Sequence, residues 1–166
     1  MRDGAPRVVE GLIDGGVRLV AHVPDTNLDR LIRLCDDAPA LQTVALAREE
    51  EGVGVCTGAY LGGSLGVLIM QNAGFLNSCN GLVTTAIQHE IPMLLLIWYA
   101  GDLGDTSFMR LGEATEPVLR GLGIRYYVLR ELEQVRRDVA RAARLALSAQ
   151  RPIACLLTRD VMEDER

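Results

Sequence analysis

The sequence predicts an α/β fold, a doubly wound, mostly parallel six-stranded sheet with helices on both faces. Three observations lead to this prediction. Short apolar runs alternate with amphipathic stretches along the whole chain. Two of these runs, residues 65–70 and 93–98, are almost entirely apolar, which is typical of strands covered by helices on both faces. Clusters of glycine, proline, asparagine and aspartate separate many of the segments and mark turns between them.

The expected elements follow one another as helix and strand. An amphipathic helix over residues 5–14 ends at Gly15 and Gly16, because consecutive glycines break a helix. A strand over residues 17–23 comes next, and residues 99–111 form a long loop that carries two Gly-Asp pairs. The other strands are expected over residues 43–46, 65–70, 93–98, 125–129 and 152–157, and the other helices over residues 28–35, 77–88, 115–121 and 131–149, with a glycine-rich helix beginning at Glu49.

Length, charge and cysteine spacing exclude several classes. At 166 residues the chain is expected to form one domain over residues 1–166. Its net charge is −5 and its basic residues are dispersed, apart from four arginines in the helix expected over residues 131–149, so we expect no nucleic-acid partner. The apolar runs are strand-sized and no signal-like segment opens the chain, which predicts a cytoplasmic protein with no membrane partner. The four cysteines form no C-x-x-C pair, so neither a zinc site nor a disulfide framework is expected.

Polar residues follow several of the expected strands at their carboxyl ends, where parallel sheets bind ligands. The turn Pro24-Asp25-Thr26-Asn27 follows the first strand, and Gln71-Asn72-Ala73-Gly74 follows the third. Either turn could serve only to cap the next helix, with Thr26 or Asn27 as the cap in the first case. The second turn also suits a loop whose backbone approaches a ligand at glycine.

Three consecutive glutamates, Glu49, Glu50 and Glu51, open the glycine-rich helix. Acidic residues in a first helical turn are favoured by the helix dipole, which alone would explain them. By helical spacing, however, Glu49 shares a face with Val53 and Cys56, so it is the one expected to point into a crevice. The glycines that follow imply that something packs very close to this helix.

Other catalytic or nucleotide-binding motifs are not indicated. His22 and His89 are expected to be structural, because neither is placed convincingly at the ligand edge. The glycines of the helix depart from the G-x-G-x-x-G pattern and follow three acids that would repel a pyrophosphate. A dinucleotide-binding domain is therefore a disfavoured alternative.

Together these motifs resemble the pyrimidine-binding domain of thiamine-diphosphate-dependent decarboxylases. In that family an acidic residue starts a helix of small residues and a glycine lies nine positions later, as Glu49 and Gly58 do here. The resemblance is to the phosphonopyruvate and sulfopyruvate decarboxylases in particular, including the separate alpha subunit of two-chain versions. It is carried by Val23-Pro24-Asp25, the Glu49 helix, Met70-Gln71-Asn72-Ala73-Gly74 with Asn77, Ile91-Pro92, Gly101-Asp102-Leu103-Gly104, Glu116-Pro117 and Gly121-Leu122-Gly123-Ile124.

The resemblance implies an activity on an anionic 2-oxo acid, with phosphonopyruvate preferred over sulfopyruvate, and thiamine diphosphate with Mg²⁺ as cofactors. Glu49 would be the catalytic residue, hydrogen-bonded to the cofactor's aminopyrimidine ring. Arg110 is a candidate contact for the substrate's anionic group. The resemblance further implies that the cofactor is bound by Pro24, Glu49, Gln71, Gly74 and Asn77, and that the substrate is faced by Asp25, Thr26 and Asn72.

This sequence lacks the motif that forms the diphosphate and magnesium half of the cofactor site in the family. That half holds magnesium through a G-D-G motif followed by an asparagine, but Gly101-Asp102 precedes Leu103 and no asparagine follows Asn80. We therefore expect a partner chain, a diphosphate-binding beta subunit that supplies the diphosphate and magnesium half in a hetero-oligomer. The main alternative is a non-catalytic interaction subunit with the same fold.

Overall fold

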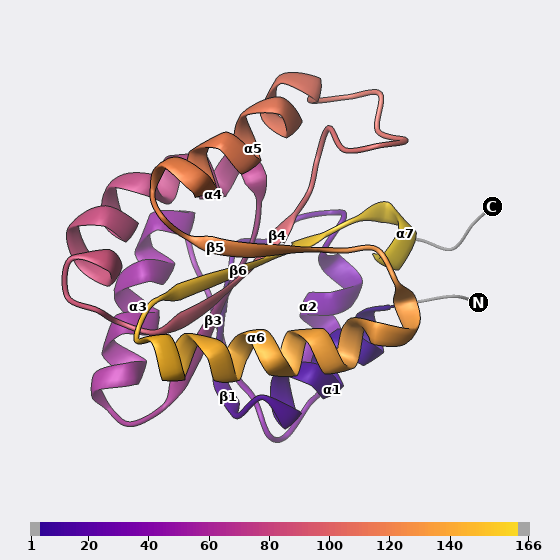
Figure 1. The fold of residues 1–166 in the computed structure, drawn as a ribbon. Coiled ribbons are helices and arrows are strands. Elements are labelled where there is room, and N and C mark those ends of the chain that lie inside the picture. The colour runs from indigo at the N-terminus through magenta and orange to yellow at the C-terminus, as the bar shows by residue number, and fades with distance from the viewer. Residues whose placement is uncertain (1–3, 163–166) are drawn as a thin grey trace.

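A computed structural model describes residues 4–162 of the chain. Six strands form one sheet in the order β2-β1-β3-β4-β6-β5, and every neighbouring pair is parallel (Figure 1). The predicted α/β fold class is therefore confirmed. The strands are β1 (Val17–His22), β2 (Gln42–Ala45), β3 (Leu65–Gln71), β4 (Met93–Trp98), β5 (Arg125–Leu129) and β6 (Pro152–Leu157).

Helices cover both faces of the sheet, as a doubly wound fold requires. One apolar layer joins the sheet to α1, α2 and α6, and the other joins it to α3, α4 and α5 (Figure 1). β4 is buried along its whole length, in agreement with its continuous apolar sequence. The helices are α1 (Ala5–Asp14), α2 (Asp29–Asp36), α3 (Glu49–Leu61), α4 (Asn72–Gly81), the π-helix η1 (Leu82–Ile87), α5 (Met109–Gly121), the 3₁₀-helix η2 (Leu132–Gln134), α6 (Val135–Ala149) and α7 (Arg159–Met162).

Two helices begin earlier than the sequence pattern predicts. Residues 71–74 are not a loop, because Gln71 ends β3 and α4 begins at Asn72. α5 begins at Met109 rather than at residue 115. Its glycine, Gly112, packs so closely against the backbone of Gly101 that a side chain would not fit. Tertiary packing thus accounts for a residue that weakens the helical signal.

The strand order changes direction at β1. The chain passes from β1 to β2 on one side and then returns to place β3 on the other side, so β1 pairs with both. In parallel α/β sheets, ligands bind beyond the carboxyl ends of strands at such a switch point. The turn after β1, the start of α3 and the start of α4 all lie at this edge. No helix within residues 4–162 is long and apolar enough to cross a membrane.

Candidate functional site

The three consecutive glutamates have three different environments. Glu51 closes the N-terminus of α3, because its carboxylate accepts hydrogen bonds from the backbone N–H groups of Ala47 (3.1 Å) and Arg48 (3.2 Å). Glu50 ties α3 to α4 by accepting a hydrogen bond from the Asn80 amide at 3.3 Å. Glu51 thus caps the helix and Glu50 links it to α4, whereas the helix dipole favours all three glutamates alike and does not distinguish Glu49 from them.

The Glu49 carboxylate has no hydrogen bond or ion pair with any other described residue, and it is only partly exposed. Its side chain lies against Gly74 in the first turn of α4. A Cβ atom added at Gly74 would come within 2.6 Å of both Cδ and Oε1 of Glu49, so only glycine leaves room for this carboxylate. The result is a carboxylate held between two helices at the switch point, with its oxygens free to accept hydrogen bonds from a ligand.

The turn after β1 meets the end of β3. Asp25 accepts a hydrogen bond from the backbone N–H of Asn27 at 2.8 Å, and its second oxygen lies 3.5 Å from the amide nitrogen of Gln71. The capping role considered for Thr26 or Asn27 is wrong. The N-cap residue of α2 is Leu28, and no side chain caps that helix. Pro24 and Thr26 are exposed at this edge.

Asn72 has a different environment from the one that substrate contact requires. Its side chain is fully buried, and its amide donates hydrogen bonds to the carbonyl of Ala100 (2.8 Å) and the hydroxyl of Thr115 (3.0 Å). It therefore joins the start of α4 to the loop after β4 and to α5. Its side-chain oxygen is buried without a partner among the described residues. Asn77 is exposed one turn after Gly74.

The two Gly-Asp pairs anchor the loop after β4. Asp102 forms a two-pronged ion pair with Arg130 (2.8 and 2.9 Å). Burial alone would raise the pKa of Asp102, but hydrogen bonds from Arg130 and from the backbone of Leu103, together with the charge of Arg130, hold the pKa below its usual value. Asp105 accepts hydrogen bonds from the N–H groups of Gly101 and Ser107. No group of three or more potential metal ligands occurs within residues 4–162.

The predicted contact for an anionic substrate is less well placed. Arg110 is 92% exposed at its side chain and pairs with Glu113 at 2.7 Å. It lies in the first turn of α5. It remains a prediction as a substrate contact.

A partly buried network that joins α5 to β5 and to the residue after β4 was missed in the sequence. Glu116 of α5 accepts hydrogen bonds from the hydroxyls of Tyr99 (2.8 Å) and Tyr126 (2.6 Å). The Tyr126 hydrogen bond is the main reason why the pKa of Glu116 is lowered. The network fixes α5 against the ends of β4 and β5, and its members lie in three separate elements, so no local pattern reveals it.

His22 ends β1 but does not belong with Glu49. Alternate residues of a strand share a face, so its side chain lies on the side of Val20, which packs with α1 and α2. Burial lowers the pKa of His22, and Asp36 of α2 acts in the opposite sense. The structural role expected for this histidine agrees with its position.

The glycines of α3 divide into two groups. Gly52 is packed against Leu68 and Leu46, so the prediction of a close approach is right for this residue. Gly54 and Gly58 face open space, and a Cβ atom at either would meet nothing within 4 Å. Leu61 at the end of the same helix is 75% exposed. This outer side of α3 is thus small, partly apolar and uncovered.

A doubly wound sheet with an unpaired carboxylate at its switch point defines a ligand-binding α/β domain. Residues 2–101 match the family described as thiamine pyrophosphate enzyme, N-terminal TPP binding domain. The chain therefore belongs to this family, and the resemblance inferred from the sequence is confirmed.

Curated relatives agree with this assignment. The chain is 34% identical over 152 residues to the sulfopyruvate decarboxylase subunit alpha of Methanococcus maripaludis, covering 90% of this chain and 91% of the relative. It is 30% identical over 166 residues to the phosphonopyruvate decarboxylase of Streptomyces viridochromogenes, covering 98% of this chain but 42% of that relative.

A solved structure supports the fold. The 2-oxoglutarate:ferredoxin oxidoreductase of Magnetococcus marinus, determined with 2-oxoglutarate, coenzyme A and succinyl-CoA bound, matches with a TM-score of 0.74. The match covers 94% of this chain and 28% of that chain at 17% identity, so it shows the architecture alone.

Proposed function

We propose that this chain, residues 1–166, is a single pyrimidine-binding domain and the alpha subunit of a two-chain thiamine-diphosphate-dependent decarboxylase. Its substrate would be an anionic 2-oxo acid. One observation carries the proposal: the carboxylate of Glu49 is unpaired and lies against Gly74, whereas those of Glu50 and Glu51 have partners within the chain. The curated relatives named decarboxylases support this reaction class.

The residues at this edge fit an aminopyrimidine ring. A carboxylate without a partner suits hydrogen bonding to a ring nitrogen, and the missing side chain at Gly74 leaves room for that carboxylate. Pro24, Gln71 and Asn77 complete the proposed cofactor surface. Thiamine diphosphate, when bound, supplies the electron sink for loss of carbon dioxide.

The contribution of the chain's own residues is to hold and orient. Glu49 would hydrogen-bond the ring nitrogen N1′ by sharing a proton with it, and would so favour the imino tautomer of the ring. Asp25 and Thr26 are proposed to face the substrate from the turn after β1. Asn72 would reach the substrate only if its buried amide changed partners, so we assign it first to holding the loop after β4.

The full-length matches alter the choice of substrate. Sequence motifs alone favoured phosphonopyruvate, but the relatives aligned over about nine-tenths of their own length are named sulfopyruvate decarboxylase subunit alpha. We therefore rank sulfopyruvate first and phosphonopyruvate second.

A partner chain would supply the diphosphate and magnesium site. The names of these relatives imply a second subunit, and the uncovered side of α3 offers a surface for it. Glycine destabilises a helix interior, and no contact within this chain requires glycine at position 54 or 58. Close contact with a partner would explain both residues.

The decisive experiment measures carbon dioxide release from both acids by the chain co-expressed with its partner, with thiamine diphosphate and Mg²⁺. Glu49→Gln should lower the rate at least about 100-fold. Glu50→Gln is the matched control, because it alters a neighbouring carboxylate that is already partnered. Equal rates in the two variants would refute the role of Glu49. A complex that binds cofactor but releases no carbon dioxide from any 2-oxo acid would instead favour the non-catalytic subunit.

A further inference from the structure

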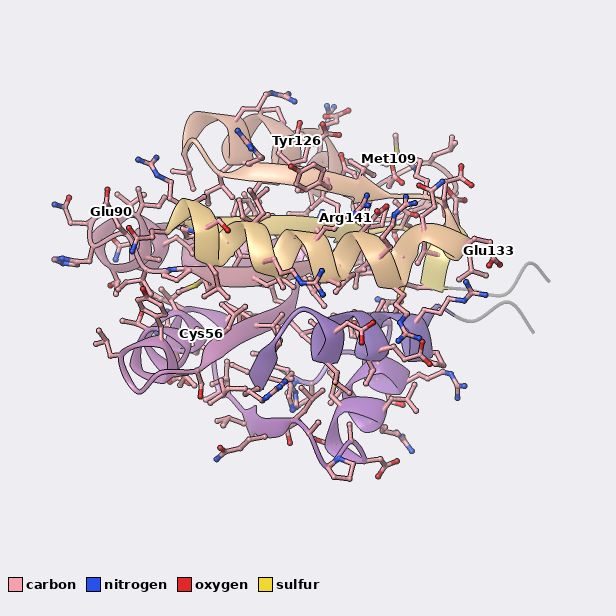
Figure 2. The ribbon with its side chains drawn as sticks, turned by 60° about the horizontal axis from the view of Figure 1, so that its bottom comes forward. Cys56, Glu90, Met109, Tyr126, Glu133 and Arg141 are labelled. Carbon is pink, nitrogen blue, oxygen red and sulfur yellow. The ribbon has the colours of Figure 1, made fainter. Side chains whose placement is uncertain are left out.

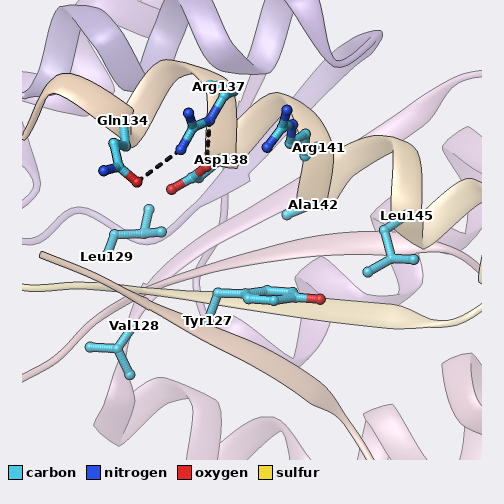
Figure 3. A pocket seen from close by; sticks show the side chains of 9 residues that line it. All are labelled: Tyr127, Val128, Leu129, Gln134, Arg137, Asp138, Arg141, Ala142 and Leu145. Atoms are coloured by element: carbon cyan, nitrogen blue, oxygen red, sulfur yellow. Dashed lines mark hydrogen bonds and ion pairs between the residues drawn. The ribbon is translucent and has the colours of Figure 1, made fainter. Parts of the chain in front are cut away.

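A second candidate site lies far from Glu49, between the edge strand β5 and helix α6 (Figure 3). The hollow has a volume of about 420 Å³, within the range of small-molecule sites. α6 covers the opposite face of the sheet from α3, so the hollow is separate from the proposed cofactor surface. Its walls include Tyr127, Leu129, Arg137, Asp138, Arg141 and Leu145.

An aromatic ring forms one side of this hollow. Tyr127 is 42% exposed, and its hydroxyl has no hydrogen bond to another described residue. The neighbouring Tyr126 points to the other face of the sheet, where it binds Glu116. Figure 3 shows the ring of Tyr127 lying along the strand below Arg141 and Leu145. The ring therefore offers a flat surface that packing within the chain does not use.

Arginines of α6 form the other side. Arg137 is held by Gln134 (2.8 Å) and Asp138 (3.1 Å). Arg141, one turn later, has no hydrogen bond or ion pair with another residue of the described chain. No cation–π contact within residues 4–162 joins it to Tyr127, so the space between guanidinium and ring is open.

Most arginines near Arg141 have a carboxylate partner. A second hollow on the other side of α6, also of about 420 Å³, shares Arg137 and Arg141 and is lined in addition by Arg136, Arg144, Asp14 and Glu133. Arg136 is neutralised by carboxylates of α1, which lies beside α6 in Figure 2. Arg144 donates only to the carbonyl of Asp14. Arg141 is therefore an arginine of this helix whose charge no carboxylate of the described chain pairs with, whereas Arg136 and Arg137 are both paired.

We propose that the hollow between β5 and α6 binds a small anion that carries a flat ring, the chemistry of a nucleoside monophosphate. The ring would lie against Tyr127 while Arg141 binds the anionic group. Guanidinium groups match phosphate and carboxylate geometry with two parallel hydrogen bonds. Ring stacking and cation–π attraction act together in such a cleft.

Calorimetric titration of the purified full-length chain with adenosine monophosphate tests this site. Saturable binding is expected, and Arg141→Gln and Tyr127→Ala should each weaken it by roughly tenfold or more. Arg144→Gln is the matched control, because this arginine lies on the same helix but outside the hollow, and it should bind as the unmodified chain does. Circular dichroism would verify that each variant is folded, as expected for changes at exposed positions.

Three further titrations make the result decisive. Adenosine and inorganic phosphate should each bind more weakly than the monophosphate; phosphate binding as tightly as the monophosphate would overturn the role of the ring. Glu49→Gln should leave monophosphate binding unchanged, and a loss there would place the ligand in the cofactor site instead. No saturable binding, or binding unaffected by both Arg141→Gln and Tyr127→Ala, would overturn the proposal.

Discussion

The glycines between α1 and α6 have the opposite environment to those on the outer side of α3. Gly11 in α1 and Gly15 just after it are packed against α6: a Cβ atom at Gly11 would lie 2.6 Å from the carbonyl oxygen of Arg136, and one at Gly15 would lie 2.7 Å from Cβ of Ala143. In α3, Gly54 and Gly58 face nothing. The contact between α1 and α6 is therefore closely packed within the chain, whereas the outer side of α3 has features that the isolated chain does not explain.

Carboxylates show the same contrast. On the α1–α6 side, Glu10 and Asp14 both pair with Arg136, at 2.8 and 2.7 Å. At the start of α3, Glu49 is left without a partner. Charge density alone does not distinguish the two regions. The informative feature is a partly buried group that the fold positions and leaves unpaired.

The largest effect should come from Gly74→Ala. The added methyl group would displace the side chain of Glu49, and a misplacement of about 1 Å can cost 100-fold in rate. The carbon dioxide assay of the reconstituted complex should fall by about that factor. The thermal midpoint of the isolated chain should stay nearly unchanged, because a flexible side chain can move aside. Gly121→Ala, where a Cβ atom would meet nothing within 4 Å, is the control for activity. A fully active Gly74→Ala complex would contradict the proposed geometry.

The next effect concerns the partner chain. Gly54→Leu and Gly58→Leu should leave the isolated chain folded, since both positions open to solvent. Each should weaken association with the partner at least about tenfold, because overpacking a close contact costs roughly 1–3 kcal/mol. Sedimentation or surface plasmon resonance would measure it, with Ser148→Leu on the exposed side of α6 as control. Unchanged association in both glycine variants would exclude this side of α3 from the interface.

Alanine substitutions in the isolated chain sharpen the comparison of the two layers. Gly11→Ala should lower the free energy of unfolding by about 1–3 kcal/mol, because backbone atoms of α6 occupy the space. Gly58→Ala should raise it by about 0.5–1 kcal/mol, the usual gain in a helix interior. Urea denaturation measures both. Effects of the same sign would show that the layers do not differ as described.

Most strands could be predicted because their composition differs from that of the turns beside them within a short stretch of sequence. β4, β5 and β6 have the predicted bounds, since each is an apolar or β-branched run between turn residues. The start of α4 was missed because Gln-Asn-Ala-Gly has the composition of a turn. The side chain of Asn72 in that helix binds partners 28 and 43 residues away, which no local window contains.

The site was predictable only in part. Helical spacing and the family resemblance singled out Glu49 from three adjacent glutamates, and its unpaired carboxylate is consistent with that choice. The burial of Asn72 and the Tyr99–Glu116–Tyr126 network depend on tertiary contacts, so sequence patterns could not reveal them. The roles of the individual site residues await the assays above.

The smallest expected effect concerns the ion pair between Asp102 and Arg130, which anchors the loop after β4. Burial acts to raise the pKa of Asp102, but the hydrogen bonds and charge of Arg130, with a backbone hydrogen bond from Leu103, together lower it in the folded chain. The pair therefore stabilises the fold above the ordinary aspartate pKa, and this contribution is lost as the pH falls through the lowered value in the folded state. Because Arg130 is 41% exposed at its side chain, the contribution should be at most about 1 kcal/mol. Unfolding free energies of the unmodified chain and Asp102→Asn should differ by this amount at pH 6 and converge as the pH drops below about 3.8. A difference that stays constant with pH would mean that Asp102 acts through packing or neutral hydrogen bonds rather than through its charge.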